Sequence, residues 1–150
     1  MPNYKELLMV SDTFFEGIDN EITILSNSSA LLNQYLENIN WVGFYLNDGE
    51  KLILGPFQGK IACMTIPYDK GVCGASFTKD EALVVGNVLE FKGHIACDSN
   101  SRSEIVIPIH KDNKIYGVLD IDSPNFNNFN DVDKDNLIKF VKTLEKALNK

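Results

Sequence analysis

The sequence is short of several features that particular classes of protein require. Basic residues are outnumbered, because 14 Lys and Arg face 21 Asp and Glu and give a formal net charge of −7. An acidic surface disfavours nucleic acid and anionic membranes as partners, since phosphates are bound by Lys and Arg. No apolar run approaches the roughly 18 residues that a membrane span needs. The N-terminal apolar stretch is interrupted by Glu6 and is too short for a signal peptide, so we expect a cytoplasmic protein.

Cysteine and histidine are also scarce. The three cysteines are Cys63, Cys73 and Cys97, and their spacings include no C-x-x-C pair. An odd, small number without a secretion signal argues against a structural disulfide framework. The only histidines are His94 and His110. A zinc site would need scattered ligands, so we expect no metal centre.

The remaining composition is that of an ordinary globular protein. The 150 residues are 44% hydrophobic and 23% charged, which excludes disordered, collagen-like and coiled-coil classes. The length suits one domain with its own core, whereas two domains would each be marginal. We therefore expect a single domain over residues 1–150.

The apolar pattern predicts an α+β fold. Apolar residues recur at helical spacing over residues 4–15, 21–36 and 130–148 and predict three helices. Asn130 is a good N-cap for the third helix. The run Ser26–Ser29 weakens the middle of the second helix. Between these helices the period is two. It predicts strands at residues 41–46, 51–57, 62–67, 83–85, 104–110 and 114–122, with a short helical turn at 74–78. Strands joined by hairpins form an antiparallel sheet, and we expect the helices on one side of it.

The cysteines occur in related settings. Gly59-Lys-Ile-Ala-Cys63 and Gly93-His-Ile-Ala-Cys97 differ at one position in five. Free cysteine usually fills a packed core, but two matching settings favour a functional pair. Cys73 lies just before the expected helical turn. A thiol at a helix N-terminus has a lowered pKa and can be reactive, and tight packing of a small residue is the equal alternative.

Carboxylates form a second candidate group. Asp120 and Asp122 lie on one face of a strand, about 7 Å apart by strand rise, so repulsion should raise one pKa. The alternative is a solvated face. Glu104 opens the partner strand. A strict two-residue turn at 112–113 pairs Glu104 with Ile121 on the wrong face, whereas a one-residue bulge, suggested by Pro108, brings it to the aspartates.

Aromatic side chains form a third group. Trp41, Gly43 and Tyr45 share one face of a strand, opposite an aliphatic face that should be core. The aromatic face could line a pocket in which the glycine makes room. Burial of both rings under the N-terminal helices is the alternative.

Together these groups point to one kind of substrate. Acids near Cys97 would raise its thiol pKa, which suits a reaction whose oxygen must be protonated by a neutral carboxylic acid. Acids also bind an ammonium group, and an aromatic cage accepts a methyl or thioether group. A small amino acid with an oxidised sulfur meets all three demands.

Over nearly its whole length the chain resembles the free methionine-R-sulfoxide reductases, which are single-domain enzymes of the GAF fold. The cysteines in their settings and the Asp-Ile-Asp pair are specific to that family. The resemblance is carried by Asn40-Trp-Val-Gly-Phe-Tyr45, Leu54-Gly-Pro-Phe-Gln-Gly-Lys-Ile-Ala-Cys63, Gly71-Val-Cys-Gly74, Gly93-His-Ile-Ala-Cys97-Asp, Ser103-Glu-Ile-Val and Gly117-Val-Leu-Asp-Ile-Asp-Ser123.

The resemblance implies a role for each of these groups. Cys97 would attack the sulfoxide sulfur and become a sulfenic acid, Cys63 would resolve it as a disulfide, and Cys73 would be an auxiliary thiol. The resemblance implies that three acids bind the ammonium group of the substrate and help to protonate the sulfoxide oxygen. It also implies that two aromatic rings enclose the methyl end. These substrate-binding residues are Glu104, Asp120, Asp122, Trp41 and Tyr45. It also implies reduction by thioredoxin, no bound cofactor, and a homodimer.

Two other functions compete with this interpretation. A GAF-type module that senses a small ligand without turnover explains fold and pocket but not three cysteines in these settings. A thiol peroxidase that uses Cys97 explains the cysteines but not the clustered acids and aromatic residues.

Overall fold

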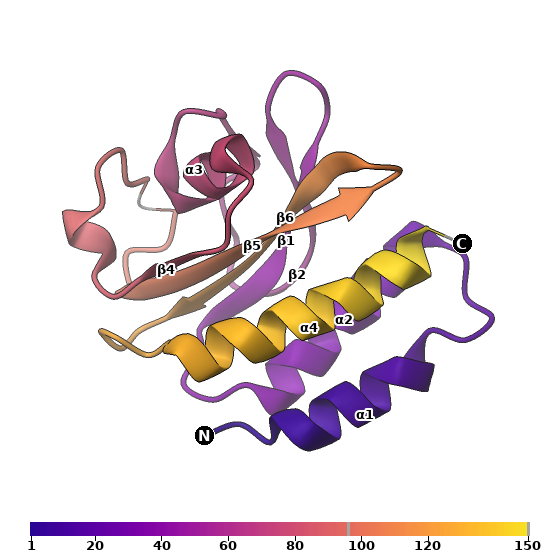
Figure 1. The fold of residues 1–150 in the computed structure, drawn as a ribbon. Coiled ribbons are helices and arrows are strands. Elements are labelled where there is room, and N and C mark those ends of the chain that lie inside the picture. Colours follow the sequence, from indigo (N-terminus) through magenta and orange to yellow (C-terminus); the bar gives the residue numbers. More distant parts are fainter. Residues whose placement is uncertain (96, 150) are drawn as a thin grey trace.

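The computed structural model describes residues 1–95 and 97–149; Ala96, within the second Gly-x-Ile-Ala-Cys motif, and Lys150 lie outside the described residues. Figure 1 shows a sheet with helices on both faces. The elements in chain order are α1 (Tyr4–Phe14), α2 (Glu21–Tyr35), β1 (Trp41–Asn47), β2 (Leu52–Gly59), β3 (Thr65–Ile66), α3 (Gly71–Lys79), β4 (Leu83–Val85), the 3₁₀ turn η1 (Val88–Glu90), β5 (Ser103–Lys111), β6 (Lys114–Ser123) and α4 (Asp131–Leu148).

All six strands form one antiparallel sheet in the order β3-β2-β1-β6-β5-β4. The expected α+β class is therefore confirmed. The three predicted helices, α1, α2 and α4, cover one face as expected, and α3 covers the other (Figure 1). The short turn expected at 74–78 is in fact a nine-residue helix. The strand expected at 62–67 shrinks to Thr65–Ile66.

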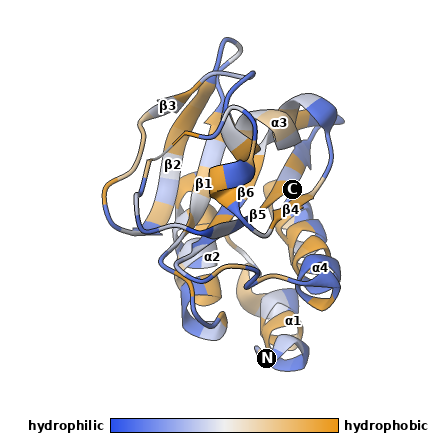
Figure 2. Ribbon diagram, turned by 90° about the vertical axis from the view of Figure 1, so that its left-hand side faces the viewer, coloured by the Kyte–Doolittle hydropathy of each residue, from blue (hydrophilic) through white to orange (hydrophobic). Residues whose placement is uncertain are grey.

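The long helices form where their sequence signals place them. Asn130 and Asp133 make a reciprocal capping box that satisfies the first free N–H groups of α4. Helix α2 is continuous through its serine run, because Ser28 and Ser29 are small enough to be buried against the core. Figure 2 shows hydrophobic and hydrophilic colours alternating along α4, as expected for a helix with one buried face. Within the described residues, no helix is long and apolar enough to cross a membrane.

The alternation of β1 divides the interior into two cores. Val42 and Phe44 pack against the three long helices. Trp41 and Tyr45 point to the opposite face, where they pack with Val72 of α3. The aliphatic face of β1 therefore packs into the main core, as predicted, and its aromatic face packs into a second, smaller cluster.

A one-residue bulge sets the register of the β5–β6 hairpin. Ile109 pairs with Gly117 but His110 pairs with Ile115, so Tyr116 is left over on β6. The shift makes Glu104 the partner of Asp122 rather than of Ile121. Of the two registers left open by the sequence, the structure therefore has the bulged one. Pro108 lies beyond the short stretch of β5 that pairs with β4, so its missing N–H is tolerated there.

Gly43 allows β1, β2 and the Trp41 ring to approach closely. A Cβ on this residue would lie 2.3 Å from Phe57 Cβ and 2.8 Å from the edge of the Trp41 indole. The space next to Gly43 is thus filled by the Cα and Cβ of Phe57 and by the Trp41 ring, so the glycine makes room for these groups.

We predict that Gly43→Ala destabilises the protein by about 1–3 kcal/mol, because the added methyl overpacks this junction. Gly55→Ala on the neighbouring strand is the matched control, since its Cβ would meet nothing closer than 3.2 Å. Urea unfolding of both variants measures the difference. Equal stability of the two would show that the close approach at Gly43 is not constraining.

Candidate active site

The candidate site is a cavity of about 50 Å³ between the sheet and α3. Seven of the eight residues singled out in the sequence line it, and the eighth, Cys63, is bonded to one of the seven. Residues from β1, α3, β5, β6 and the loop after η1 therefore meet at one point. The lining residues among the eight are Trp41, Tyr45, Cys73, Cys97, Glu104, Asp120 and Asp122.

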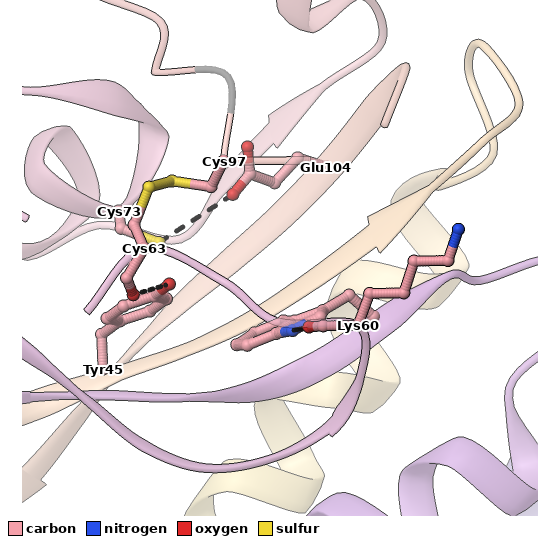
Figure 3. Close-up of a disulfide and its surroundings, with 7 residues drawn as sticks. Tyr45, Lys60, Cys63, Cys73, Cys97 and Glu104 are labelled. Carbon is pink, nitrogen blue, oxygen red and sulfur yellow. Dashed lines mark hydrogen bonds between the residues drawn. A yellow bond between two sulfur atoms is a disulfide. The ribbon is translucent and has the colours of Figure 1, made fainter. Parts of the chain in front are cut away.

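A disulfide joins Cys63 and Cys97 at one side of the cavity (Figure 3). Their Cα atoms are 5.3 Å apart, although the residues are 34 positions apart in the chain. Cys63 lies on the loop between β2 and β3, and Cys97 on the loop that leads to β5. The bond thus links a loop next to the edge strand β3 with a segment that follows the opposite edge strand, β4.

The two aromatic residues position the loop that carries Cys63. The Tyr45 hydroxyl donates to the Cys63 carbonyl oxygen at 2.9 Å (Figure 3). Trp41 Nε1 donates to the Lys60 carbonyl oxygen at 3.2 Å. Each bond fastens this loop to a buried ring, since Trp41 and Tyr45 are 3% and 2% exposed. The sequence did not predict this anchoring role.

The same rings form one wall of the cavity. Their centroids are 5.8 Å apart with planes 23° from parallel. They lie on the face opposite the N-terminal helices, so the alternative that those helices cover them is wrong. An apolar group that enters the cavity would meet their faces and edges.

The carboxylates lie in adjacent cross-strand rows. Asp122 is paired with Trp41 on one side and with Glu104 on the other, and Asp120 occupies the next row. Directly opposed residues of an antiparallel pair share a face, so all three acids point at the cavity. Glu104 is 9% exposed and Asp120 is 5% exposed. The alternative of a solvated acidic face is therefore wrong for these two residues.

Burial and mutual repulsion favour the neutral forms of these acids. For all three, burial is the largest cause and raises the pKa well above its ordinary value. The next cause is a neighbouring charge: Asp120 for Glu104, Asp122 for Asp120, and Glu104 for Asp122. A carboxyl group kept protonated near neutral pH can donate a proton to a bound oxygen.

Cys73 lies in the first turn of α3, not before it, and its thiol is 3.9 Å from Glu104 Oε2. Burial raises the pKa of this thiol well above its ordinary value, and Asp120 and Glu104 raise it further. The lowered pKa considered for a helix N-terminus is therefore wrong, because burial of the thiol, the largest cause, disfavours its charged form. In the protein with the Cys63–Cys97 disulfide, Cys73 is a buried, tightly packed thiol.

Asn40 is the main residue at the site that the sequence analysis did not single out. Its Nδ2 donates to Asp98 Oδ2 at 3.0 Å and to Ser101 Oγ at 3.2 Å. Its backbone N–H donates to the Asp122 carbonyl oxygen at 2.9 Å. Asn40 thereby fastens the loop after Cys97 to the sheet. Its position directly before Trp41 was the one sequence feature that could have pointed to this role.

One group of residues could hold a metal ion. Cys73 Sγ and one carboxylate oxygen each of Glu104 and Asp120 lie within 4.8 Å of one another, and no other such triad occurs within residues 1–95 and 97–149. His110 lies elsewhere, with Nε2 2.8 Å from Asp80 and Nδ1 3.2 Å from Glu145.

Known proteins share this fold. Residues 20–148 match the GAF domain family. The structure of fRMsr of Staphylococcus aureus in its reduced form has a TM-score of 0.96 at 54% identity, and the match covers 99% of this chain and 96% of that one. The protein is therefore a GAF-domain protein, as the motifs implied.

The similarity extends to named enzymes. The free methionine-R-sulfoxide reductase of Escherichia coli is 48% identical over 141 residues, which cover 94% of this chain and 82% of the E. coli protein. The Neisseria meningitidis free methionine-R-sulfoxide reductase in complex with its substrate has a TM-score of 0.92 at 40% identity, with 97% and 87% of the two chains covered. The chain belongs to the free methionine-R-sulfoxide reductase family, which confirms the resemblance.

We predict that Asp120→Asn stabilises the oxidised protein at pH 8 by about 1 kcal/mol or more, because the folded wild type must keep on Asp120 a proton that the unfolded chain releases at this pH, and asparagine has no such cost. The folded-state pKa is raised above the unfolded value, so the wild type binds more protons when folded and loses stability as pH rises. The advantage of the variant should therefore shrink toward pH 5. Urea unfolding at both pH values measures it, with Asp12→Asn, an exposed acid, as the control. A variant that is less stable than wild type at pH 8 would contradict the argument.

Proposed function

We propose that this protein reduces free L-methionine-R-sulfoxide to methionine by a thiol mechanism. The observation that carries the proposal is the Cys63–Cys97 disulfide beside a cavity lined by two buried acids, a third that is half-buried, and two aromatic rings. The family membership supports it, because relatives named for this activity match nearly the whole chain. The preference for the R epimer rests on those relatives alone.

The cavity provides a partner for the amino end and the methyl end of this substrate. The ammonium group pairs with the carboxyl groups of Glu104, Asp120 and Asp122, of which one or more ionises when the cation enters. The sulfur-bound methyl group packs against Trp41 and Tyr45. A peptide-bound or N-acetylated methionine sulfoxide has no ammonium group, so it lacks the first of these interactions.

The chemistry follows from the positions of the thiols. The Cys97 thiol attacks the sulfoxide sulfur while a neutral carboxyl group protonates the oxygen; the oxygen passes to Cys97 as a sulfenic acid and methionine leaves. The Cys63 thiol then attacks the sulfenic sulfur, which forms the disulfide and releases water. A dithiol protein, thioredoxin, reduces the disulfide, with Cys73 as an auxiliary thiol in the exchange. No bound cofactor enters any step, and the protein acts as a homodimer.

The proposed activity is tested by chiral amino-acid analysis of racemic free methionine sulfoxide after incubation with protein and dithiothreitol. We expect loss of the R epimer only, no loss with Cys97→Ser, and no loss of the N-acetylated compound. Circular dichroism shows whether the variant is folded. If folded wild type consumes neither epimer, the sensor function replaces this one. If it consumes hydrogen peroxide faster than the sulfoxide, the peroxidase function does.

The proposed mechanism makes a separate prediction for Cys63→Ser. Without the resolving thiol, the thioredoxin-dependent steady-state rate should fall at least about tenfold. One equivalent of methionine per protein should still form, with Cys97 trapped as a sulfenic acid by dimedone. Dithiothreitol provides the control, because a small dithiol can reach the sulfenic acid directly and restore turnover. An unchanged rate with thioredoxin would remove Cys63 from the resolving role.

A further inference from the structure

The cluster of Cys73, Glu104 and Asp120 has the composition of a metal site. One sulfur and two carboxylate oxygens lie within 4.8 Å of one another, and the Cys73 Sγ to Glu104 Oε2 distance is 3.9 Å. A zinc ion with a Zn–S distance of about 2.3 Å and Zn–O distances of about 2.0–2.2 Å holds its tetrahedral ligand atoms about 3.5 Å apart, so the three side chains would move toward the ion as it binds. Three protein ligands leave the fourth tetrahedral position for water.

A second observation shows that this cluster lacks a partner of positive charge. Asp120 Oδ1 is buried and accepts no hydrogen bond from any residue that the structure describes. A buried oxygen without a partner can accept a hydrogen bond from water or bind a cation, although the Asp120 carboxyl group also interacts with Glu104 and Cys73. The described residues that line the cavity include four acids and no Lys or Arg. The site therefore favours a cation, and the orphaned oxygen lies on one of the three ligand side chains.

We propose that Cys73, Glu104 and Asp120 bind a zinc ion when Cys63 and Cys97 are joined in their disulfide. The combination of one thiolate with two carboxylates selects Zn²⁺ or its analogue Cd²⁺ over Mg²⁺ and Ca²⁺, which prefer six or more oxygen ligands. The protons of the thiol and the carboxyl groups pass to the buffer as the ion binds. No electron is transferred, so the disulfide is unaffected.

The same carboxylates are those that we assign to the substrate ammonium. Zinc and free methionine sulfoxide would therefore exclude each other, and zinc would act as a competitive inhibitor. This consequence rests on the proposed function, whereas the binding of the ion does not. Binding can accordingly be measured on the oxidised protein without any turnover.

Cadmium titration of the oxidised full-length protein tests the site directly. With Cys63 and Cys97 bonded, Cys73 is the only free thiol, so an ultraviolet thiolate-to-cadmium charge-transfer band reports this residue alone. We expect one equivalent of Cd²⁺ to bind with such a band, Zn²⁺ to displace it, and Mg²⁺ to leave it unchanged. Cys73→Ser should lose the band.

The carboxylates are tested by charge-matched variants. Asp120→Asn should weaken Cd²⁺ binding at least about tenfold through loss of a ligand. Asp69→Asn removes the same charge from an exposed turn four residues before Cys73 and should leave the affinity unchanged. Absence of the band in folded wild type would overturn the proposal. Equal affinity of the Asp120→Asn variant and wild type would also overturn it, since the thiol would then bind the ion without its proposed partners.

Discussion

The one-residue bulge at Tyr116 is the constraint on which the site depends. It changes which residues of β5 and β6 face each other, and every side chain from Glu104 to Ile109 would point to the opposite face without it. With it, Glu104 joins Asp120 and Asp122 on the face that α3 covers. Three acids, two of them buried and Asp122 half-buried, are thereby brought together, an arrangement that is unfavourable when they are charged. Their pKa values are therefore raised, which favours the protonated forms.

One face of the sheet carries the larger hydrophobic core, and the other face carries the candidate active site. Long helices with apolar faces cover one side and form the larger core. The other side is covered by the single helix α3 and by loops, and it holds the cysteines, the acids and the paired rings of Trp41 and Tyr45. Because loops carry Cys63 and Cys97, the bond between them can be made and broken without disturbing the main core. Hydrogen bonds from the Tyr45 hydroxyl and the Trp41 indole keep the Cys63 loop in reach of its partner.

Local sequence signals predicted most of the fold but only part of the site geometry. Helix α4 and both hairpins were found because caps, turns and apolar periods are local properties. Helix α3 was underestimated, because its glycines and Cys73 have weak helix propensity and the contacts that stabilise it come from the sheet. The register at Glu104 required knowledge of a bulge that the sequence only suggests through Pro108. The Asn40 bonds to Asp98 and Ser101 join residues about 60 positions apart, and no local pattern predicts such contacts.

The central claim is that the buried acids stay protonated near neutral pH beside the cysteines. Carbon-detected NMR titration of the carboxyl groups of Glu104, Asp120 and Asp122 in the oxidised protein tests it most directly. The account predicts that the three titrate as a coupled group, with apparent pKa values well above those of the exposed acids. If all three carboxyl groups instead titrated over the same pH range as the exposed aspartates and glutamates, the result would contradict the account.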